Sequence, residues 1–358
     1  MNKNKYEWDI CISGSKNHPI EVYRGSFVLD DGFNKEFRSL GGGGRMYEGY
    51  WSSPGNTMTS ADRYPLPTEL SVIWFSFTEV KFYGGNFELP YGKIVDLFQE
   101  NSQIRKSDGI GLSLRVGFAP GGLVTVWASC GPYLAEIYHF QAKEVEVTFE
   151  EFQPNVTDVS VSEYVKVCLS DDYLFYLRKY LTTHTIDSEI ALFKRYMKRF
   201  NTGFKVSLAS PQVNKISNFN VQFANGERLP FFPDDSFFSE RGEYASMKYF
   251  EVNWHHTDSY GKRSELQANV CIKREEFLRI YQEAWGGDHT KAVDVMVNIS
   301  ADNKGIEIYL TDGVNRYDFD KEFIQAAGYN YTTKKLLFRS SNYDGTKEHK
   351  FTWDDYSD

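Results

Sequence analysis

The chain has 358 residues, which exceeds the length that one hydrophobic core usually serves and predicts two domains. Hydrophobic residues make up 41% of it and aromatic residues 16%, so the chain can bury enough surface to fold, which excludes a disordered protein. The formal net charge of −9 argues against nucleic acid as a partner, because phosphate backbones are bound by clusters of Lys and Arg.

The first half of the chain predicts strands, one helix and an antiparallel meander. The helix is expected over 89–100, where Ile94, Leu97 and Phe98 share one face and Pro90 suits the first turn. Alternating apolar residues and β-branched runs predict the strands. These strands cover residues 8–12, 20–23, 70–74, 112–116 and 123–127, with a last one at Tyr138 and Phe140.

The middle of the chain predicts two helices that join the halves. Apolar residues recur with helical spacing over 172–181 and again over 188–200. Asp187 suits an N-cap and Gly203 a helix stop. The stretch 201–215, which contains Pro211, is where the sequence places the boundary between units.

The second half repeats the pattern of the first, and this internal repeat decides the expected fold. Trp254 ends a strand as Trp74 does, and a helix over 272–283 is followed by Gly286 as a stop. Val293, Val295, Val297 and Ile299 then alternate with polar residues before a turn at 302–305. Other matching positions are Phe219–Phe223 in an early strand, Ile306, Ile308 and Leu310 in the returning strand, and Tyr317 and Phe319 in the last.

We therefore expect an α+β protein of two similar units. Each unit is expected to be an antiparallel β-sheet or meander with one packed helix, and a helical connector is expected to join them. The expected boundaries are 1–155 for the first β-rich unit, 156–213 for the connector and 214–358 for the second unit.

Four motifs in the first unit carry a family resemblance. They are Leu66–Tyr83 (LPTELSVIWFSFTEVKFY), Phe87–Pro90 (FELP), Val116–Trp127 (VGFAPGGLVTVW) and Phe140–Ala142 (FQA). Together they cover roughly residues 6 to 150 and resemble the bacterial family of uncharacterised proteins known as DUF2931. The second unit keeps Trp254 but has His255–Asp258 where the first has Phe75–Thr78, so it is expected to be a divergent repeat.

The resemblance implies a role at the bacterial envelope. Members of the family are often exported lipoproteins, and some are encoded beside toxic effectors of the type VI secretion system, which implies an immunity role. The family has no assigned catalytic residues to carry over, and the usual lipid-anchor Cys near the N-terminus is missing. As the sequence stands the protein is expected in the cytoplasm, or in the periplasm as a lipoprotein if an export signal was removed.

Metal and cofactor sites are not expected. His255, His256 and Asp258 form the most metal-like cluster, but neighbours on a strand point to opposite faces, so at most one of the histidines joins Asp258. The 4 cysteines are far apart and show no CxxC pair, which signals neither zinc nor a disulfide framework. No run of 18 apolar residues predicts a transmembrane helix.

A glycine-rich segment supplies most of the candidate binding residues. Gly41–Gly44 lacks the ending of a phosphate-binding loop and is expected to be a surface loop. The residues after it belong to types that are enriched at the centres of protein interfaces. The candidates for partner binding are Arg45, Tyr47, Tyr50, Trp51 and, from the second unit, Trp285.

Motifs of nucleophilic catalysis are absent from the sequence, which favours a binding protein over an enzyme. The expected function is a non-enzymatic inhibitor of the immunity type that covers a secreted toxin. A carbohydrate- or envelope-binding module is the alternative, for which Trp51, Trp285 and Trp353 would have to form an exposed strip. A hydrolase of unrecognised type would need a deep pocket with clustered polar side chains.

Overall fold

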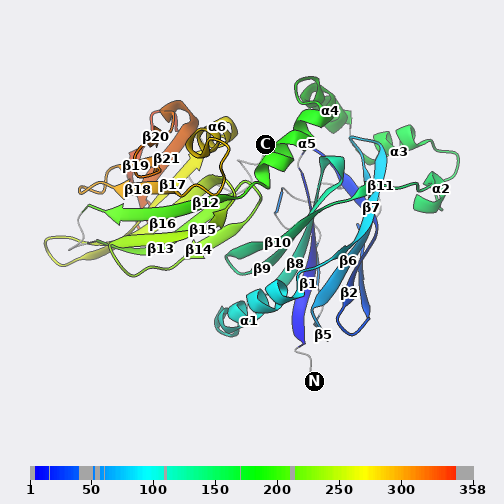
Figure 1. Cartoon of the computed structure of the whole chain (residues 1–358), viewed down its shortest axis with the longest axis horizontal. Coiled ribbons are helices and arrows are strands. Elements are labelled where there is room, and N and C mark those ends of the chain that lie inside the picture. Colours follow the sequence, from blue (N-terminus) through cyan, green and yellow to red (C-terminus); the bar gives the residue numbers. More distant parts are fainter. Residues whose placement is uncertain are drawn as a thin grey trace. The chain divides into compact units, whose positions relative to one another are not determined.

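A computed structural model describes residues 5–15, 17–39, 51–52, 57–59, 61–108, 111–169, 171–209 and 214–343, with the backbone alone over 100–108. The chain has a mixed α+β fold and divides into two compact units between Lys194 and Arg195 (Figure 1).

The first unit contains two sheets, and the first of them is antiparallel throughout. Its strands lie in the order β11-β7-β6-β2-β3, so β3 lies at one edge. They are β2 (Ile20–Leu29), β3 (Asn34–Phe37), β6 (Pro67–Ser76), β7 (Lys81–Glu88) and β11 (Lys143–Glu144).

The second sheet of this unit is mixed, which corrects the expectation of purely antiparallel strands. Its order is β4-β1-β8-β9-β10, with β5 also paired to β1, and β1 runs parallel to β8. The chain between β1 and β8 passes through the other sheet and helix α1 (Tyr91–Asp108), which is long enough to return in the same direction. The strands are β1 (Tyr6–Gly14), β4 (Thr57–Met58), β5 (Arg63–Tyr64), β8 (Leu112–Ala119), β9 (Leu123–Cys130) and β10 (Tyr133–Gln141).

The core of the first unit lies between these sheets. The alternating side chains of β6 and β8 point into it, where Trp74 packs on Phe118 with ring centroids 4.8 Å apart. Helix α1 adds Ile94 and Phe98, which are buried as the helical spacing predicted.

Four helices follow β10, and the first three cover one end of the outer face of the antiparallel sheet. They are α2 (Phe149–Phe152), α3 (Val161–Cys168), α4 (Asp171–Thr183) and α5 (Ile186–Tyr196). Capping boxes begin α2 at Thr148 and α3 at Ser160. Apolar side chains of α2, α3 and α4 pack against Phe75 and Phe77, so these helices belong to the first unit.

The second unit also contains two sheets. One has the order β22-β21-β17-β16-β13-β14 and the other β15-β12-β18-β19-β20, with β12 parallel to β18. Helix α6 (Arg274–Trp285) ends at Gly286, whose φ of 58° is left-handed, in the place that the sequence predicted. The strands are β12 (Phe200–Leu208), β13 (Asn214–Phe223), β14 (Arg228–Phe231), β15 (Phe237–Tyr244), β16 (Met247–Thr257), β17 (Arg263–Ile272), β18 (Val293–Ile299), β19 (Ile306–Thr311), β20 (Arg316–Asp318), β21 (Ile324–Asn330) and β22 (Leu336–Arg339).

Strand β12 occupies much of the stretch 201–215 in which we expected the boundary between units. Phe204, Val206 and Leu208 alternate there and are buried, so the segment is a strand of the second unit. The expected connector 156–213 is therefore divided: α3 and α4 pack on the first unit and β12 belongs to the second.

The two units place their strands in the same sequential order. The series β3-β2-β6-β7-β11 corresponds to β14-β13-β16-β17-β21, and β1-β8-β9-β10 corresponds to β12-β18-β19-β20. Helix α1 lies between β7 and β8 in the chain, as α6 lies between β17 and β18. Trp74 on β6 and Trp254 on β16 thus lie on corresponding strands, and both are fully buried.

Candidate functional site

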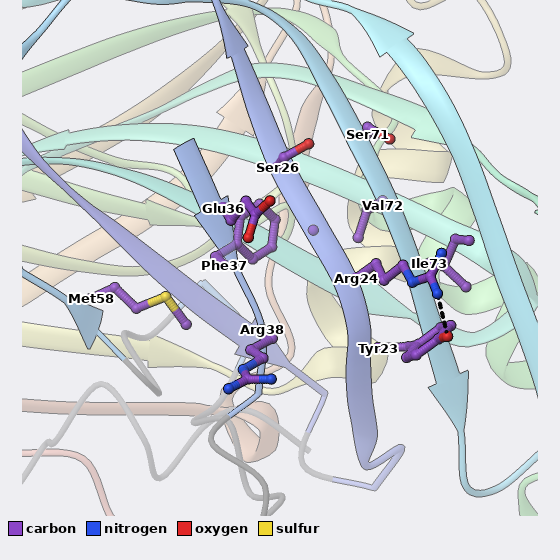
Figure 2. Close-up of a pocket in the computed structure, with 11 residues that line it drawn as sticks. Tyr23, Arg24, Ser26, Glu36, Phe37, Arg38, Met58, Ser71, Val72 and Ile73 are labelled. Carbon is purple, nitrogen blue, oxygen red and sulfur yellow. Dashed lines mark hydrogen bonds between the residues drawn. The ribbon is translucent and has the colours of Figure 1, made fainter. Parts of the chain in front are cut away.

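A groove with a volume of about 940 Å³ lies in the first unit at β2, β3 and β6 of the antiparallel sheet, and Met58 of β4, a strand of the other sheet, also lines it (Figure 2). Helices α2 to α4 cover part of the outer face of the antiparallel sheet. The side chains that give the groove its chemistry are Arg24, Ser26, Glu36, Arg38, Ser71 and Ile73.

A β-bulge in β2 positions Arg24. The register between β2 and β6 shifts between Val22 and Arg24, which turns Arg24 to the outer face. Its guanidinium lies over the ring of Tyr23, 4.6 Å from the centroid, and its Nη2 donates a hydrogen bond of 2.7 Å to the Tyr23 hydroxyl. The neighbouring tyrosine therefore limits the motion of this side chain.

Gly25 allows the edge strand to approach. A Cβ at this position would lie 2.5 Å from the ring of Phe37, a distance that real Cβ contacts do not show. Phe37 is buried beneath the groove and holds β3 against β2. Its two neighbours in the chain, Glu36 and Arg38, are exposed.

The groove is lined by two arginines and one glutamate, so its formal charge is positive on a protein whose net charge is negative. Within the described part of the chain, neither Arg24 nor Arg38 forms an ion pair with a carboxylate. A guanidinium binds carboxylate or phosphate through paired hydrogen bonds, so the groove suits an acidic group. Among the described strands β3 lies at the sheet edge, and an edge strand can pair with an extended segment of a partner.

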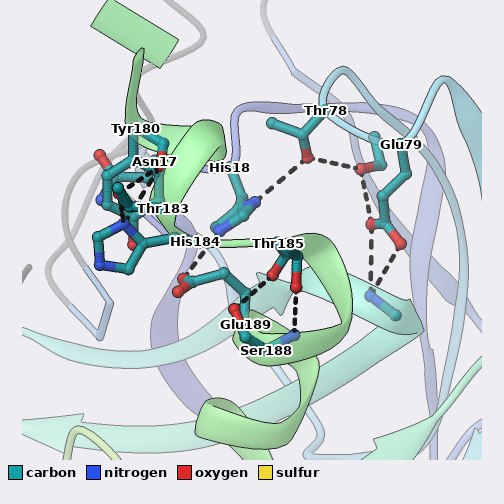
Figure 3. A network of polar contacts seen from close by, with 12 residues as sticks. Asn17, His18, Thr78, Glu79, Tyr180, Thr183, His184, Thr185, Ser188 and Glu189 are labelled. Carbon is teal, nitrogen blue, oxygen red and sulfur yellow. Dashed lines mark hydrogen bonds and ion pairs between the residues drawn. The ribbon is translucent and has the colours of Figure 1, made fainter. Parts of the chain in front are cut away.

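A buried polar network lies elsewhere in the same unit (Figure 3). His18 shares a hydrogen bond of 3.2 Å with the Thr78 hydroxyl through Nδ1, and its Nε2 lies 3.1 Å from the Glu189 carboxylate on α5. A hydroxyl, an imidazole and a carboxylate in series resemble a nucleophilic triad. The side chains of His18 and Glu189 are only 1% and 4% exposed, however, so a substrate atom has no access to the imidazole. The pair instead holds α5 to the turn between β1 and β2.

Glu79 ties two turns of the first unit together. Its carboxylate accepts hydrogen bonds from the Tyr83 hydroxyl at 2.7 Å, the Ser76 hydroxyl at 2.9 Å and the backbone N–H of Gly121 at 3.1 Å. Burial, and then the Glu79 carboxylate, raise the pKa of Tyr83. Gly121 and Gly122 have φ of 70° and 79°, which glycine adopts without strain.

Glu79 and the residues that bond to it lie within two of the sequence motifs, Leu66–Tyr83 and Val116–Trp127. A family model, described as a protein of unknown function (DUF2931), matches residues 1–188. The chain belongs to the DUF2931 family. The matched region extends past residue 150, where the motifs end, and includes α2, α3 and α4. The family description assigns no activity, and comparisons with curated proteins and with solved structures find no match.

Within the DUF2931 region, a second polar contact fixes the helical cover. Glu21 on β2 accepts hydrogen bonds from the Tyr164 hydroxyl at 2.6 Å and from the Gln153 amide at 3.0 Å. Burial raises the pKa of Glu21, although these two hydrogen bonds act in the opposite direction. The contact therefore joins α3 and the end of α2 to the sheet that carries the groove.

Two of the five candidate residues from the sequence are buried, and this corrects their expected role. Trp51 is 6% exposed and packs edge-on against Trp127 at 4.9 Å and Phe193 at 5.1 Å. Trp285 is 1% exposed and stacks on Tyr281. A partner cannot contact either ring, because each already buries its faces in the core.

The other three candidates, Arg45, Tyr47 and Tyr50, lie outside the described residues, as do Gly41–Gly44 and Trp353. The groove residues Arg24 and Arg38 were not singled out by sequence reasoning. Arg38 lies two residues before this undescribed segment. A charged residue directly after a short strand was the one feature of the sequence that could have indicated it.

His255, His256 and Asp258 each have different neighbours in the structure. His256 shares a hydrogen bond of 2.8 Å with the Asn214 side chain, and His255 lies across from Glu265 on β17. Asp258 accepts hydrogen bonds from the backbone N–H groups of a turn, those of Tyr260 and Lys262. No group of three metal-binding side chains is found among the described residues. Within the same residues, no helix has the length and apolar character needed to cross a membrane.

Proposed function

We propose that this DUF2931 chain is a non-enzymatic binding protein, and most concretely an immunity-type inhibitor that covers a secreted toxin of the type VI class. The observation that carries the proposal is the groove beside strand β3, where neither Arg24 nor Arg38 forms an ion pair with a carboxylate of the described residues. The burial of His18 and Glu189 supports a role other than catalysis, because it closes the site that most resembles a catalytic one.

The groove suits one extended segment of a partner. Ile73 offers an apolar contact, Ser26 and Ser71 offer hydroxyl groups, and the two guanidiniums offer sites for a carboxylate side chain. Stable interfaces bury on the order of 1,200–2,000 Å² in total, so the groove can supply only the central contacts of a larger interface. In the sequence, Arg45, Tyr47 and Tyr50 follow Arg38 closely and would extend that interface.

We also infer that the second unit is a divergent copy of the first and that two similar units make up the chain. Support comes from the common strand order and from the position of a β-bulge. In β2 the register shifts directly after the pair Val22 and Trp74, and in β13 it shifts directly after the pair Ile216 and Trp254. Bulges are specific features of a fold, so a bulge at the same place supports a common origin.

The test uses the full chain as bait for proteins of the cells that encode it. We expect one toxin-like protein to be retained in equimolar amount and its activity to be blocked by this chain. The double substitution Arg24→Ala/Arg38→Ala should weaken binding by at least about 30-fold, since a charged hot spot contributes roughly 2 kcal/mol. Arg178→Ala/Lys179→Ala removes the same charge from an exposed part of α4 and serves as the matched control.

Two outcomes would contradict the proposal. If the groove variant captures and inhibits the toxin as well as the control does, the groove is not the binding site. If no protein is retained, or only envelope material rich in glycans, the inhibitor role is wrong.

A further inference from the structure

The outer face of the larger sheet of the second unit carries a compact array of polar side chains. Two rows cross β13, β16 and β17: one is Asn220, Glu251 and Asn269, and the other is Asn218, Asn253 and Gln267. We call these six residues the amide grid. Residues directly opposite on antiparallel strands share a face, so all six point away from the core. The opposite face of the same strands is apolar and buried, with Phe219, Phe250 and Val252 fully covered.

The hydrogen bonds of the amide grid are incomplete. Glu251 accepts from the side-chain amides of Asn253 at 2.9 Å and Asn220 at 3.3 Å. The side-chain oxygens of Asn218, Asn220, Asn253 and Asn269 are enclosed but have no hydrogen-bond partner in the described part of the chain. Leaving a polar group unpaired is costly, so an array of four such groups calls for a physical explanation.

The composition of the grid restricts what can complete it. It contains no Lys or Arg, so a phosphate or carboxylate ligand would meet the charge of Glu251 without a cation. An apolar ligand would leave the amides unpaired. Hydroxyl groups donate and accept, as primary amides do, so adjacent hydroxyls can satisfy both ends of an asparagine side chain. The terminal torsion of asparagine is broad and two-fold, which lets each amide turn toward such a ligand.

The width of the grid and an aromatic residue at its border also favour a ligand that carries hydroxyl groups. Three strands spaced by about 4.8 Å give a width of about 10 Å, which suits a flat ligand of about two sugar rings. On β21, Tyr329 lies opposite Gln267 and so extends the second row with an aromatic ring. The apolar face of a sugar packs on such rings, while its hydroxyls contact neighbouring amides.

The corresponding positions of the first unit line its groove. Ser26 pairs with Ser71 there as Asn220 pairs with Glu251, and Arg24 pairs with Ile73 as Asn218 pairs with Asn253. In both units a bulge precedes the second of these pairs. The same part of the sheet therefore faces away from the core in both units, but its side chains differ in chemistry.

We propose that the amide grid binds a neutral oligosaccharide, with the six polar side chains contacting its hydroxyls and Tyr329 contacting a ring face. This site is distinct from the groove of the first unit and does not depend on the toxin-binding role. Its expected affinity is modest, in the range of about 10 µM to 1 mM, because a flat face buries little of a small ligand.

The test records the side-chain amide signals of the isotope-labelled full chain by NMR. The probes are the hexasaccharides of maltose, cellulose and chitin, each added at millimolar concentration. We expect one of them to shift the side-chain signals of the grid asparagines in a saturable manner. Titration calorimetry of the same probe then gives its dissociation constant.

The variant Asn253→Val/Asn269→Val separates binding from folding. Valine suits a strand better than asparagine and leaves no unpaired amide, so this variant should fold at least as stably as the original chain. We expect it to lose at least about ten-fold in affinity. Asn86→Val, on β7 of the first unit, makes the same exchange on an exposed strand position outside the grid and should leave binding unchanged.

Three results would overturn the proposal. In the first, no probe shifts the grid signals, or the double valine variant binds as tightly as the original chain. In the second, the signals shift with protein concentration alone, which means that a second copy covers the face. In the third, only oligolysine shifts them, which means that Glu251 recruits a basic peptide. Toxin capture by the double valine variant should be intact, so failure here is distinguishable from failure of the inhibitor role.

Discussion

Replacing His18 with leucine removes the imidazole that lies 3.1 Å from the buried Glu189 carboxylate, and we expect the first unit to lose about 3–5 kcal/mol of unfolding free energy. The two side chains are 1% and 4% exposed, so water cannot take the place of the ring. Glu189→Met should cost a similar amount, because it removes the hydrogen-bond partner of His18 Nε2. Such losses are large for a unit whose total stability is on the order of 5–15 kcal/mol.

The double variant His18→Leu/Glu189→Met tests whether the two buried side chains stabilise the fold only as a pair. It replaces both polar partners with apolar side chains of similar size, and we expect its stability to lie within about 1 kcal/mol of the original chain. Urea unfolding followed by hydrogen exchange on peptides of α5 and β6 reports on the first unit alone. The control is Lys81→Ala, which breaks an ion pair with exposed side chains and should cost less than about 1 kcal/mol. If the losses of the two single variants simply add in the double variant, the pair does not act as a unit and our account of it is wrong.

Three further predictions concern buried groups. Burial lowers the pKa of Lys248 from 10.5 to about 8, so between these pH values the unfolded chain holds this proton and the folded chain does not. The free energy of unfolding should therefore rise as pH increases from about 8 toward 10.5. Lys248→Met should add up to about 3 kcal/mol at pH 7 and lose that pH dependence, which urea unfolding across this range measures. Burial raises the pKa of Glu21 above 4.5, so its contribution is present below pH 4.5 and is lost as pH rises through the raised pKa; the stability of Glu21→Gln relative to the original chain should therefore increase from pH 4 to pH 7, and an unchanged difference contradicts the assignment. Gly117→Ala would place a Cβ 2.3 Å from the ring of Trp127, and we expect a loss of about 1–3 kcal/mol in thermal unfolding, with no loss if the ring can move aside.

Local patterns in the sequence predicted most elements, because side chains alternate on strands and recur every three or four residues on helices. Val293–Ile299 forms β18 as its alternation indicated, and α6 stops at Gly286. The parallel pairing of β1 with β8 was not predictable in this way, since it joins segments about 100 residues apart in the chain. Strand β12 was missed because Pro211 and the surrounding polar residues outweighed the alternation of Phe204, Val206 and Leu208.

The candidate site was harder to predict than the fold. Trp51 and Trp285 were selected by residue type, although Tyr281, four residues before Trp285, already placed that tryptophan on the apolar face of a helix. Arg24 reaches the groove only because a bulge shifts the register of β2, and no local pattern shows where a bulge occurs. The sequence could not show the amide grid for a similar reason, since it depends on which residues of β13, β16 and β17 lie opposite one another.

The bulge explains how one architecture can present two surfaces. The register of β2 shifts beside the buried Trp74 of β6, and that of β13 shifts beside the buried Trp254 of β16. The shift turns the adjacent residue pair to the outer face, and the core beneath keeps its packing. In the first unit that pair is Arg24 and Ile73, whereas in the second it is Asn218 and Asn253. Because these side chains do not contribute to the core, substitutions there change the chemistry of the sheet surface at little cost in stability. Our proposal that the second unit is a divergent copy of the DUF2931 unit therefore predicts that the two differ at these outward positions, where the core does not constrain the choice of residue.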